Sequence, residues 1–320
     1  MQLLEDKYDQ FLKKINVAKT ILLLRHIHPD GDCVGAQQAL YHFIKLNFPN
    51  KVIHFWGEKI SHYLTELFPN EYKKKPKKLL TNYDTQILVD TSSKSRVDYS
   101  LKLSKNLIII DHHPKEDIKS DFEIRCENLS SACEILTKMF FYFQKKYGLK
   151  LNKEIAKCLY VGITTDTKRM WYNLTSDLLR ITADLLEFGI DTKFINETIY
   201  YWEINEIRFR NILINKAKIV GCCIYVIIEA PTYAKYNLNY QTAKDLTLSL
   251  VEINKGKYFV IAVMNNETNE YHVSLRSKEK RIDQFAIKFG GGGHPLASGV
   301  KIKEKKKVQK LIKEIIEYSK

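Results

Sequence analysis

The sequence has no long apolar run. None of its hydrophobic segments approaches the roughly 18 residues that a membrane-spanning helix needs. Its first residues, MQLLEDKYDQFLKK, are charged and amphipathic, and they lack the apolar core and the small-residue cleavage site of a secretory signal. We therefore expect a cytoplasmic protein that has no membrane partner.

Paired cysteines are also missing. The six cysteines form no C-x-x-C pair, and none has the spacing to histidine that is typical of a zinc site. The sequence therefore predicts reduced, mostly buried thiols instead of disulfides. It also contains no internal repeat.

The chain is long and apolar enough to bury two cores. It has 320 residues, of which 45% are hydrophobic, so two domains are the default expectation. Its formal net charge of +14 favours a polyanionic substrate. A solvated lysine surface explains the charge equally well, because Lys far outnumbers Arg and an AT-rich coding sequence produces this composition. We interpret the lysine-rich runs at 72–78 and 301–310 as loop and helix surface.

Short runs of Ile, Val and Leu alternate with helical patterns in the first part of the chain. These runs are apolar throughout, which is typical of strands in a parallel sheet that is covered on both faces. The alternation predicts an α/β domain with a doubly wound parallel sheet. Strands are predicted at 20–24, 51–55, 86–89 and 106–110, and helices at 34–47, 131–147, 152–163 and 175–188.

The pattern changes after a connecting helix that is predicted at 203–216. The later elements predict a smaller α+β domain, in which the segment NNETN joins two strands as a hairpin. We expect a first domain at 1–195, a linker at 196–217 and a second domain at 218–320. The later strands are predicted at 218–229, 257–264 and 270–276, and the later helices at 281–288 and 304–318.

The stretch RHIHPDGDCVGA, residues 25–36, is more polar than a turn requires. It follows a predicted buried strand directly. A tight turn explains the segment from Pro29 to Gly31, but it leaves His26, His28 and Asp32 unexplained. This excess of polar side chains indicates a ligand.

Carboxylates recur where the apolar segments end. Asp30 and Asp32 follow the first predicted strand, and Asp90, Asp111 and Asp166 end later apolar segments. Ligands of an open α/β sheet bind beyond the carboxyl ends of its strands, so we expect these groups to converge there. Five carboxylates in one crevice raise each other's pKa or require a cation. A metal site is the simplest interpretation.

The ligand types indicate which metal. Carboxylate oxygens and imidazole nitrogens without a thiolate suit Mn²⁺ or Mg²⁺, and the set is large enough for two ions about 3.5–4 Å apart. Taken singly, Asp90 could end a strand in a turn, Asp166 could cap a helix, and His112 or His113 could be a surface histidine. Four clusters at four strand ends together favour the metal site.

The motifs HIHPDGD, ILVD, DHH and GITTDT resemble motifs I to IV of the DHH phosphoesterase superfamily, in that order. The segment FGGGGHPLASG, residues 289–299, is similar to the glycine-rich signature of the C-terminal domain in one branch of that superfamily. The resemblance covers nearly the whole chain. The DHH motif together with the glycine-rich segment is its specific part.

The resemblance implies a two-metal centre, with Mn²⁺ as the expected ion and Mg²⁺ as the alternative. Asp90 would bridge the two ions, and a Pro-Asp-Gly turn would aim the side chains of Asp30 and Asp32 at neighbouring ions. His28 lies outside the pattern. The implied metal ligands are His26, Asp30, Asp32, Asp90, His112 and Asp166.

The resemblance also implies catalytic and substrate contacts. His113 would face substrate oxygens, and Asp111 would orient an imidazole. In the second domain, backbone N–H groups of the glycines would form a phosphate nest, although a flexible hinge is the alternative, and the arginine would bind a phosphate unless it forms a surface ion pair. The expected substrate-binding residues are Arg276, Gly291, Gly292, Gly293 and His294.

The compact two-domain branch of the superfamily implies the activity. We expect hydrolysis of short RNA oligonucleotides to mononucleotides, of 3′-phosphoadenosine 5′-phosphate (pAp) to AMP, or of both, with short substrates favoured. A soluble phosphodiesterase for linear or cyclic dinucleotides is the alternative, and a non-catalytic nucleic-acid-binding protein is disfavoured by the complete ligand set. Lys168 stands where the family commonly has Gly, near Asp166. The oligomeric state stays open, with a homodimer as one option.

Overall fold

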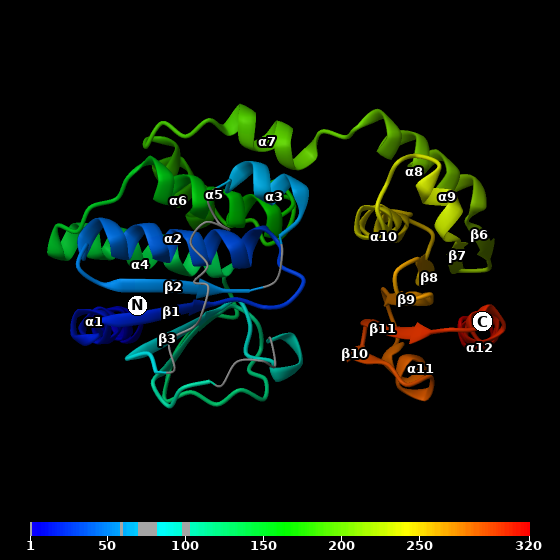
Figure 1. The fold of residues 1–320 in the computed structure, drawn as a ribbon, viewed down its shortest axis with the longest axis horizontal. Helices are drawn as coiled ribbons and strands as arrows, with labels where there is room; N and C mark the ends of the chain where they lie inside the picture. The colour runs from blue at the N-terminus through cyan, green and yellow to red at the C-terminus, as the bar shows by residue number, and fades with distance from the viewer. Residues whose placement is uncertain (1, 58–59, 70–81, 98–102) are drawn as a thin grey trace. The chain divides into compact units, whose positions relative to one another are not determined.

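The chain divides into two compact units, residues 1–201 and 202–320 (Figure 1). The computed structural model describes residues 2–57, 60–69, 82–97 and 103–320, and the lysine-rich run at 72–78 lies outside the described residues. Each unit buries hydrophobic clusters of its own.

A parallel sheet forms the centre of the first unit. In the described residues its strands follow the order β2-β1-β3-β4-β5, and every pairing is parallel. This confirms the predicted α/β class. The sequence did not predict β5, because only every second side chain of this edge strand is buried and its sequence, FEIR, is half polar. The strands are β1 (Thr20–Leu24), β2 (Val52–Trp56), β3 (Thr85–Val89), β4 (Leu107–Asp111) and β5 (Phe122–Arg125).

Helices and connecting segments cover the two faces of this sheet. The elements are α1 (Gln2–Val17), α2 (Gly31–Asn47), α3 (His62–Leu67), η2 (Lys94–Arg96), α4 (Ala132–Tyr147), α5 (Lys153–Asp166), α6 (Ser176–Leu186) and α7 (Thr192–Tyr200). Helices α2 and α4 lie side by side over one face, where the rings of Phe43 and Phe140 stack 4.0 Å apart (Figure 1). Tyr83, Val97 and Ile118 pack against the other face.

Helix α2 begins three residues earlier than predicted. Asp30 is its N-cap, and the Asp30 carboxylate accepts a hydrogen bond from the backbone N–H of Cys33 at 3.1 Å. This capping draws Gly31 and Asp32 into the first helical turn. Asp32 therefore projects from a helix, and the expectation of a tight turn that aims both carboxylates is wrong.

Two glycines let α2 and α5 pack closely. A Cβ atom on Gly35 would lie 2.5 Å from the carbonyl oxygen of Cys158 in α5. A Cβ atom on Gly162 in α5 would lie 2.2 Å from the sulfur of Cys133 and 2.8 Å from a carboxylate oxygen of Asp32. Real Cβ atoms do not approach other atoms so closely, so both positions require glycine.

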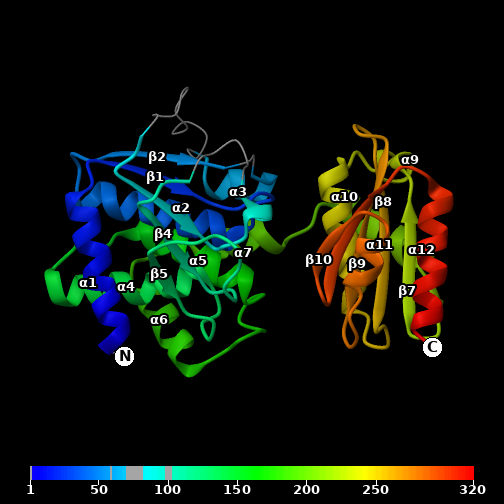
Figure 2. The ribbon, with the colours of Figure 1, turned by 90° about the horizontal axis from the view of Figure 1, so that it is seen from below.

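The second unit is an α+β domain with a mixed sheet, as predicted. Its strand order is β10-β11-β9-β8-β7-β6, with β7 and β8 parallel and the other pairs antiparallel (Figure 2). The strands are β6 (Lys218–Val220), β7 (Cys223–Ile228), β8 (Tyr258–Asn265), β9 (Glu270–Ser277), β10 (Gly292–His294) and β11 (Ala297–Ile302).

Helices pack on both faces of the second sheet. They are α8 (Ile204–Lys216), α9 (Ala230–Ala234), α10 (Tyr240–Thr247), η3 (Leu248–Glu252), α11 (Asp283–Lys288) and α12 (Lys305–Tyr318). Helices α11 and α12 contribute to one apolar cluster, and α8, α9 and α10 contribute to the other. Phe209 and Leu213 of α8 are fully buried in the latter cluster, within the range that was expected to be a linker.

One predicted strand is two strands. The apolar run at 218–229 turns back at Gly221 and Cys222, so that Val220 pairs with Cys223 in an antiparallel hairpin. Gly221 has a φ of 59°, a conformation that glycine adopts without steric cost. The single strand predicted for 218–229 is therefore wrong.

No helix within the described ranges combines the length and the apolarity that crossing a bilayer requires.

Candidate metal centre

Most of the predicted site residues converge at the carboxyl edge of the first sheet. His26 follows β1 by two residues, Asp90 follows β3 directly, and β4 ends in Asp111, after which His112 and His113 follow. The strand order changes direction between β1 and β3, which is where open α/β sheets bind ligands. The topology therefore brings these residues together.

Two candidate ligands come from helices instead of strands. Asp166 is the last residue of α5, so its predicted position at a strand end is wrong. The helix predicted at 152–163 continues three residues further than expected and so includes Asp166. Asp32 lies in the first turn of α2. The N-terminus of α2 and the C-terminus of α5 thus add residues to the cluster that lies at the ends of β1, β3 and β4.

Asp90 lies at the centre of the cluster. One of its carboxylate oxygens, Oδ2, is 3.2 Å from Nε2 of His26, and the other, Oδ1, is 3.3 Å from Nε2 of His112. The same two imidazole nitrogens lie 3.5 Å from Asp30 and 3.5 Å from Asp166, respectively. Asp90 has a φ of 60°, in the left-handed region that Asp and Asn tolerate better than most residues.

Three overlapping groups of side chains in the described residues have donor atoms close enough to share an ion. All donor atoms within each group lie within 4.8 Å of one another. The groups are His26, Asp30, Cys33 and Asp90; Asp90, His112 and His113; and Asp32, His112 and Asp166.

The buried polar atoms of the cluster fit a bound cation. Oδ1 of Asp90 and Nε2 of His112 are buried and have no hydrogen-bond partner in the described part of the chain. Such atoms are costly unless something satisfies them. A divalent ion satisfies both at once, and oxygen and imidazole donors suit Mn²⁺ and Mg²⁺.

The pKa values of the cluster show that the carboxylates repel one another when no metal neutralises them. Burial, together with the charges of Asp90 and Asp166, raises the pKa of Asp32 well above its usual value. Burial and Asp90 raise the pKa of Asp166 to about 6. Burial alone would lower the pKa of His112, but the carboxylates around it raise that pKa to about 9. Without a metal, the raised pKa values mean that protons supply the positive charge that a bound cation would otherwise supply.

His26 is oriented by the backbone. Its Nδ1–H donates a hydrogen bond to the carbonyl of Ile27 at 2.7 Å. A carbonyl only accepts, so Nδ1 carries a proton, and Nε2 is the nitrogen that faces Asp30 and Asp90. This orientation leaves Nε2 as the nitrogen that would bind a metal ion.

Asp32 connects the site to a second helix. Its carboxylate oxygens accept hydrogen bonds from the backbone N–H groups of Ala132 at 2.7 Å and Cys133 at 2.9 Å, at the N-terminus of α4. These N–H groups lack partners within their own helix. The carboxylate is therefore held in place, and its charge is stabilised by the positive end of the helix dipole.

Asp111 positions His113. One oxygen of Asp111 accepts hydrogen bonds from Nδ1 of His113 at 2.9 Å and from the His113 backbone N–H at 3.1 Å. The other accepts from Arg125 at 2.7 Å. Asp111 is completely buried, and burial alone would raise its pKa, but these hydrogen bonds lower it. Asp111 is therefore charged and holds the His113 ring by Nδ1.

The structure adds two residues to the site that the sequence did not indicate. Arg125, in the unpredicted strand β5, also donates to the carbonyl of His113 at 2.5 Å. Cys33 belongs to the group around His26, although the sequence predicted only a reduced, buried thiol there. The only indication in the sequence was that Cys33 follows Asp30 by three residues. This spacing does not predict a metal ligand unless the fold is known.

The predicted substrate-binding residues all lie in the second unit. Arg276, near the end of β9, donates to the carbonyls of Leu275 at 2.9 Å and Ser298 at 3.3 Å. In the described residues it forms no ion pair with a carboxylate. The glycine segment is not a simple loop, because residues 292–294 form β10 and pair with β11, and His294 is exposed there.

Close strand packing explains two of the glycines. A Cβ atom on Gly291 would lie 2.2 Å from the carbonyl oxygen of Gly299, and one on Gly293 would lie 2.6 Å from Cα of Ser298. Gly292, in contrast, has open space where a Cβ atom would lie. Steric demand therefore accounts for Gly291 and Gly293 whether or not they bind a phosphate.

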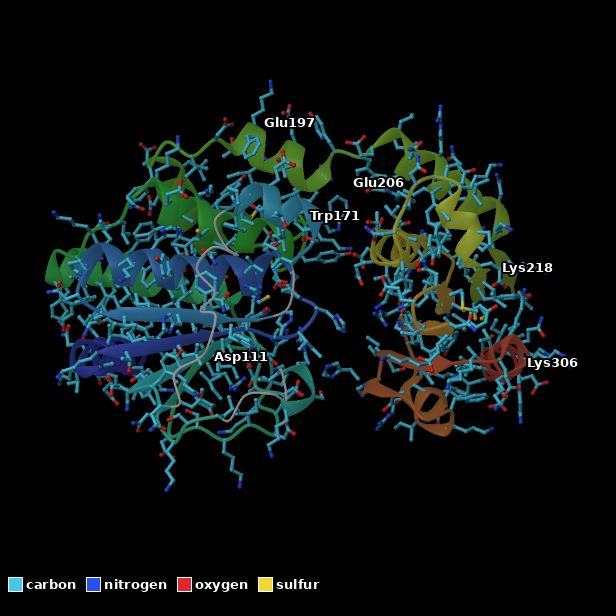
Figure 3. All side chains as sticks on the ribbon, viewed as in Figure 1. Asp111, Trp171, Glu197, Glu206, Lys218 and Lys306 are labelled. Carbon is cyan, nitrogen blue, oxygen red and sulfur yellow. The ribbon has the colours of Figure 1, made fainter. Side chains whose placement is uncertain are left out.

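An unusual turn follows Asp166. Lys168, Arg169 and Met170 have φ values of 45°, 60° and 64°, so three consecutive residues with side chains are left-handed. The turn folds back so that the backbone N–H of Trp171 donates to the carbonyl of Thr167 at 2.8 Å. Trp171 is 80% exposed (Figure 3). Lys168 thus occupies a conformation that favours glycine.

The comparisons agree with the fold. The model of the DHH family, N-terminal domain, matches residues 20–163, and that of the DHHA1 domain matches residues 223–320. The chain is 31% identical over 305 residues to the bifunctional oligoribonuclease and PAP phosphatase NrnA of Mycoplasma genitalium, with 92% of each protein covered. It is 32% identical over 301 residues to the probable bifunctional oligoribonuclease and PAP phosphatase NrnA of Streptococcus mutans, covering 91% of this chain and 92% of that protein.

A solved structure shares the fold of the whole chain. The crystal structure of an exopolyphosphatase-related protein from Bacteroides fragilis has a TM-score of 0.83 and 22% identity, covering 98% of this chain and 96% of that one. The parallel sheet and its cluster of carboxylates and imidazoles define a protein that binds divalent metal ions. The chain belongs to the DHH family, which confirms the resemblance of its motifs.

Proposed function

We propose that the protein is a metal-dependent phosphoesterase that hydrolyses short RNA oligonucleotides to mononucleotides and pAp to AMP, with Mn²⁺ as its metal. The observation that carries this proposal is the cluster around Asp90, whose buried, unpartnered oxygen needs a cation. The names of the relatives from Mycoplasma genitalium and Streptococcus mutans support the choice of substrates.

Six side chains would hold the metal: His26, Asp30, Asp32, Asp90, His112 and Asp166. Divalent ions at such a site supply Lewis-acid stabilisation of phosphoryl oxygens and activation of water for attack. The protein contributes the fixed geometry. Asp90 lies between His26 and His112, Asp32 is held by the N-terminus of α4, and the backbone fixes the tautomer of His26.

His113 would contact the substrate. Its Nδ1 is held by Asp111, and the side chain is 36% exposed, so Nε2 is the nitrogen that remains for a phosphate oxygen. Asp111 acts only through His113, because it is completely buried between His113 and Arg125. Asp111 is therefore a positioning residue.

The second unit would bind another part of the substrate. The guanidinium of Arg276 uses NH1 for two carbonyls, which leaves further N–H donors for a phosphate. The exposed backbone of Gly292 and the exposed His294 side chain are the adjacent candidates. Trp171, in the first unit, offers an exposed ring on which a base can stack.

A substrate panel tests the proposed function. Purified protein is incubated with pAp, RNA of two, five and twenty-four nucleotides, and linear and cyclic dinucleotides, each with Mn²⁺ or Mg²⁺. We expect release of mononucleotides from the short RNAs and of AMP from pAp, with slower turnover of the longest strand. Activity on dinucleotides alone would replace the proposed substrates, and equal or faster turnover of the longest strand would indicate a processive exonuclease.

Asp90→Asn is the matched inactive variant. Asn tolerates the left-handed conformation at position 90 and keeps the side-chain shape, so only the charge is lost. We expect turnover and binding of two Mn²⁺ ions to be lost together. Asp184→Ala is the control, because Asp184 is exposed on α6. Two Mn²⁺ ions bound to Asp90→Asn in calorimetry would exclude Asp90 as the shared ligand.

A further inference from the structure

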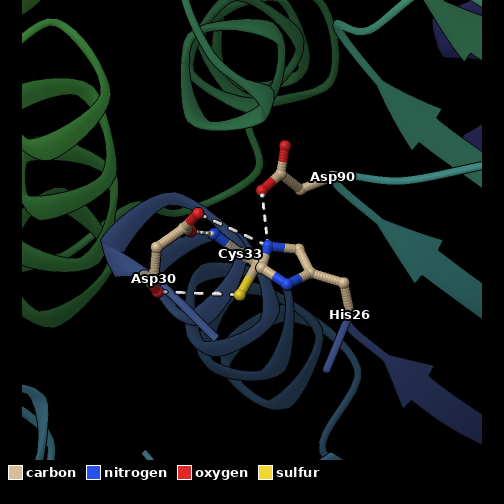
Figure 4. Close-up of side chains that lie close together, drawn as sticks. All are labelled: His26, Asp30, Cys33 and Asp90. Atoms are coloured by element: carbon tan, nitrogen blue, oxygen red, sulfur yellow. Dashed lines mark hydrogen bonds and ion pairs between the residues drawn. The ribbon is translucent and has the colours of Figure 1, made fainter. Parts of the chain in front are cut away.

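Cys33 lies inside the candidate metal centre. It is in the first turn of α2, and its sulfur lies with donor atoms of His26, Asp30 and Asp90 in a group whose members are all within 4.8 Å of one another (Figure 4). The thiol is completely buried and lies 3.6 Å from the backbone carbonyl of Asp30. The sulfur therefore faces the same small volume as two carboxylates and an imidazole.

The other buried thiols near the site differ from Cys33. Cys133 is equally buried, but its sulfur lies 3.5 Å from the backbone carbonyl of Asp32 and 4.0 Å from that of Cys158. Neither Cys133 nor Cys158 belongs to any candidate metal group in the residues that the structure describes. Burial alone does not explain why Cys33 lies among metal-ligating side chains.

Asp90 supplies the independent indication that this volume receives a cation. Its side chain is 2% exposed, and its Oδ2 faces Nε2 of His26 at 3.2 Å. The same nitrogen lies 3.5 Å from a carboxylate oxygen of Asp30. A positive charge, either a proton or a metal ion, must lie between this imidazole nitrogen and the two carboxylates.

The two metal positions then differ in their donor atoms. The position at His26, Asp30 and Asp90 has sulfur within reach, whereas the position at Asp32, His112 and Asp166 has only oxygen and nitrogen. Thiolates favour softer ions, and carboxylates with imidazoles accommodate Mn²⁺ and Mg²⁺. A bound cation also provides the positive charge that allows a coordinating thiol to release its proton to solvent.

We propose that Cys33 is a ligand of the metal ion at the His26, Asp30 and Asp90 position, and that this position binds Co²⁺, Zn²⁺ or Cd²⁺ more tightly than the position at Asp32, His112 and Asp166 does. The centre is then asymmetric, with one softer position and one harder position. This inference concerns metal binding alone, and it stands independently of the substrate in the proposed function.

Cobalt absorption tests the ligand directly. A thiolate bound to Co²⁺ produces an intense charge-transfer band in the near ultraviolet, which oxygen and imidazole ligands do not produce. The full-length protein, stripped of metal, is titrated with Co²⁺ as wild type, Cys33→Ala and Cys133→Ala. We expect the band in wild type and Cys133→Ala and its loss in Cys33→Ala. Absence of the band in wild type, or its survival in Cys33→Ala, would overturn the proposal.

Metal affinities provide the second measurement. Loss of even an outer-shell partner typically weakens metal binding about 10–100-fold, so Cys33→Ala should weaken Cd²⁺ binding at the first position by at least about tenfold. Mn²⁺ binding should change by less than about threefold, because sulfur contributes little to its preference. Equal effects on Cd²⁺ and Mn²⁺, with thermal unfolding unchanged, would show that Cys33 only packs. Loss of binding of both ions with a lowered Tm would also contradict the ligand assignment.

Discussion

At the scale of single residues, the candidate site depends on side chains held by specific partners. Asp111, Arg125 and His113 form one such chain, and Asp32 is fixed by two backbone N–H groups of α4. Preorganised ligands of this kind lose little freedom when an ion binds. Substitutions should therefore separate residues that bind the metal from residues that bind substrate.

Arg276 tests the substrate contacts of the second unit. Arg276→Ala removes the donors that would bind a phosphate, and loss of a charged hydrogen bond costs about 2–3 kcal/mol, or roughly 30–150-fold in kcat/KM. Mn²⁺ affinity should be unchanged, because the proposed metal ligands lie in the other unit. Arg276→Lys should be nearly as impaired, since it keeps the charge and loses the planar fork. Arg208→Ala, at an exposed position, is the control, and normal kinetics of Arg276→Ala would remove Arg276 from the site.

The pKa values predict proton release on metal binding. Without metal, the pKa of His112 is raised to about 9, so the imidazole holds a proton at neutral pH, and Asp166, with a pKa of about 6, holds one below that pH. A metal displaces these protons. Mn²⁺ affinity should therefore rise as the pH increases from about 6 to about 9. Calorimetry at neutral pH in two buffers with different ionisation enthalpies measures the release, and identical apparent enthalpies would contradict it.

Lys168 should be replaceable by glycine with a gain in stability. Its φ of 45° is left-handed, which costs a residue with a Cβ atom about 1–2 kcal/mol. Lys168→Gly should raise the free energy of unfolding by about 1 kcal/mol, whereas Lys168→Ala keeps the steric cost and serves as the control. Urea denaturation measures both. A gain of the same size in Lys168→Ala would assign the effect to the lysine side chain instead of the backbone.

At the scale of elements, the close packing of α2 and α5 positions two ligands. Asp32 lies in the first turn of α2, and Asp166 is the last residue of α5. The glycines at 35 and 162 set the separation between the helices. The metal centre therefore depends on helix packing as much as on the sheet edge.

Gly162→Ala tests this dependence. The new methyl group would lie 2.2 Å from the Cys133 sulfur and 2.8 Å from Asp32, so the helix or the carboxylate must move. We expect a loss of about 1–3 kcal/mol in the free energy of unfolding and weaker Mn²⁺ binding. Gly292→Ala is a matched control, since its Cβ atom meets open space. Unchanged Mn²⁺ affinity in Gly162→Ala would show that the site tolerates a shift of α5.

Three strands that the sequence predicted well share one property. Strands β1, β3 and β4 are almost completely buried, and Leu, Ile and Val dominate their sequences. Strands β5, β10 and β11 were missed, because FEIR is half polar, GGH is rich in glycine and ASGVKI begins with small residues. The helix predicted at 152–163 exists, but it continues three residues further and ends at Asp166.

The candidate ligands could be named from sequence because carboxylates and histidines are unusual directly after apolar runs. The interactions around them could not be inferred. Arg125 reaches Asp111 from an unpredicted strand, and Ala132 and Cys133 donate to Asp32 from a helix that lies 100 residues away along the chain. Only tertiary packing creates such contacts. The position of Cys33 among these side chains was not predicted for the same reason.

At the scale of the whole molecule, the two units have separate cores and separate roles in the proposal. The proposed metal ligands all belong to the unit at 1–201, and the predicted phosphate contacts belong to the unit at 202–320. Each sheet is covered by helices of its own unit. Binding of metal alone should therefore stabilise only the unit at 1–201.

Hydrogen exchange in the full chain measures this separation. A ligand at 100 times its Kd stabilises the state that binds it by about 2.7 kcal/mol, so Mn²⁺ should slow exchange about 100-fold in amides that open with the metal site. We expect protection in β1, β3, β4 and the first turns of α2 and α4. The strands β7, β8 and β9 should exchange at unchanged rates. Equal protection of these strands would show that the metal couples the two units.

The arrangement of the first sheet also has a consequence for folding kinetics. Strand β1 pairs with β2 on one side and with β3, which begins at Thr85, on the other, and the site is complete only when Asp166 at the end of α5 has docked. Parallel pairings between segments distant in sequence form slowly, because loop closure precedes any stabilising contact. The ligands remain dispersed through the collapsed chain until this step is finished. A divalent ion therefore does not nucleate folding. It binds and stabilises only the molecules that have already reached the native topology.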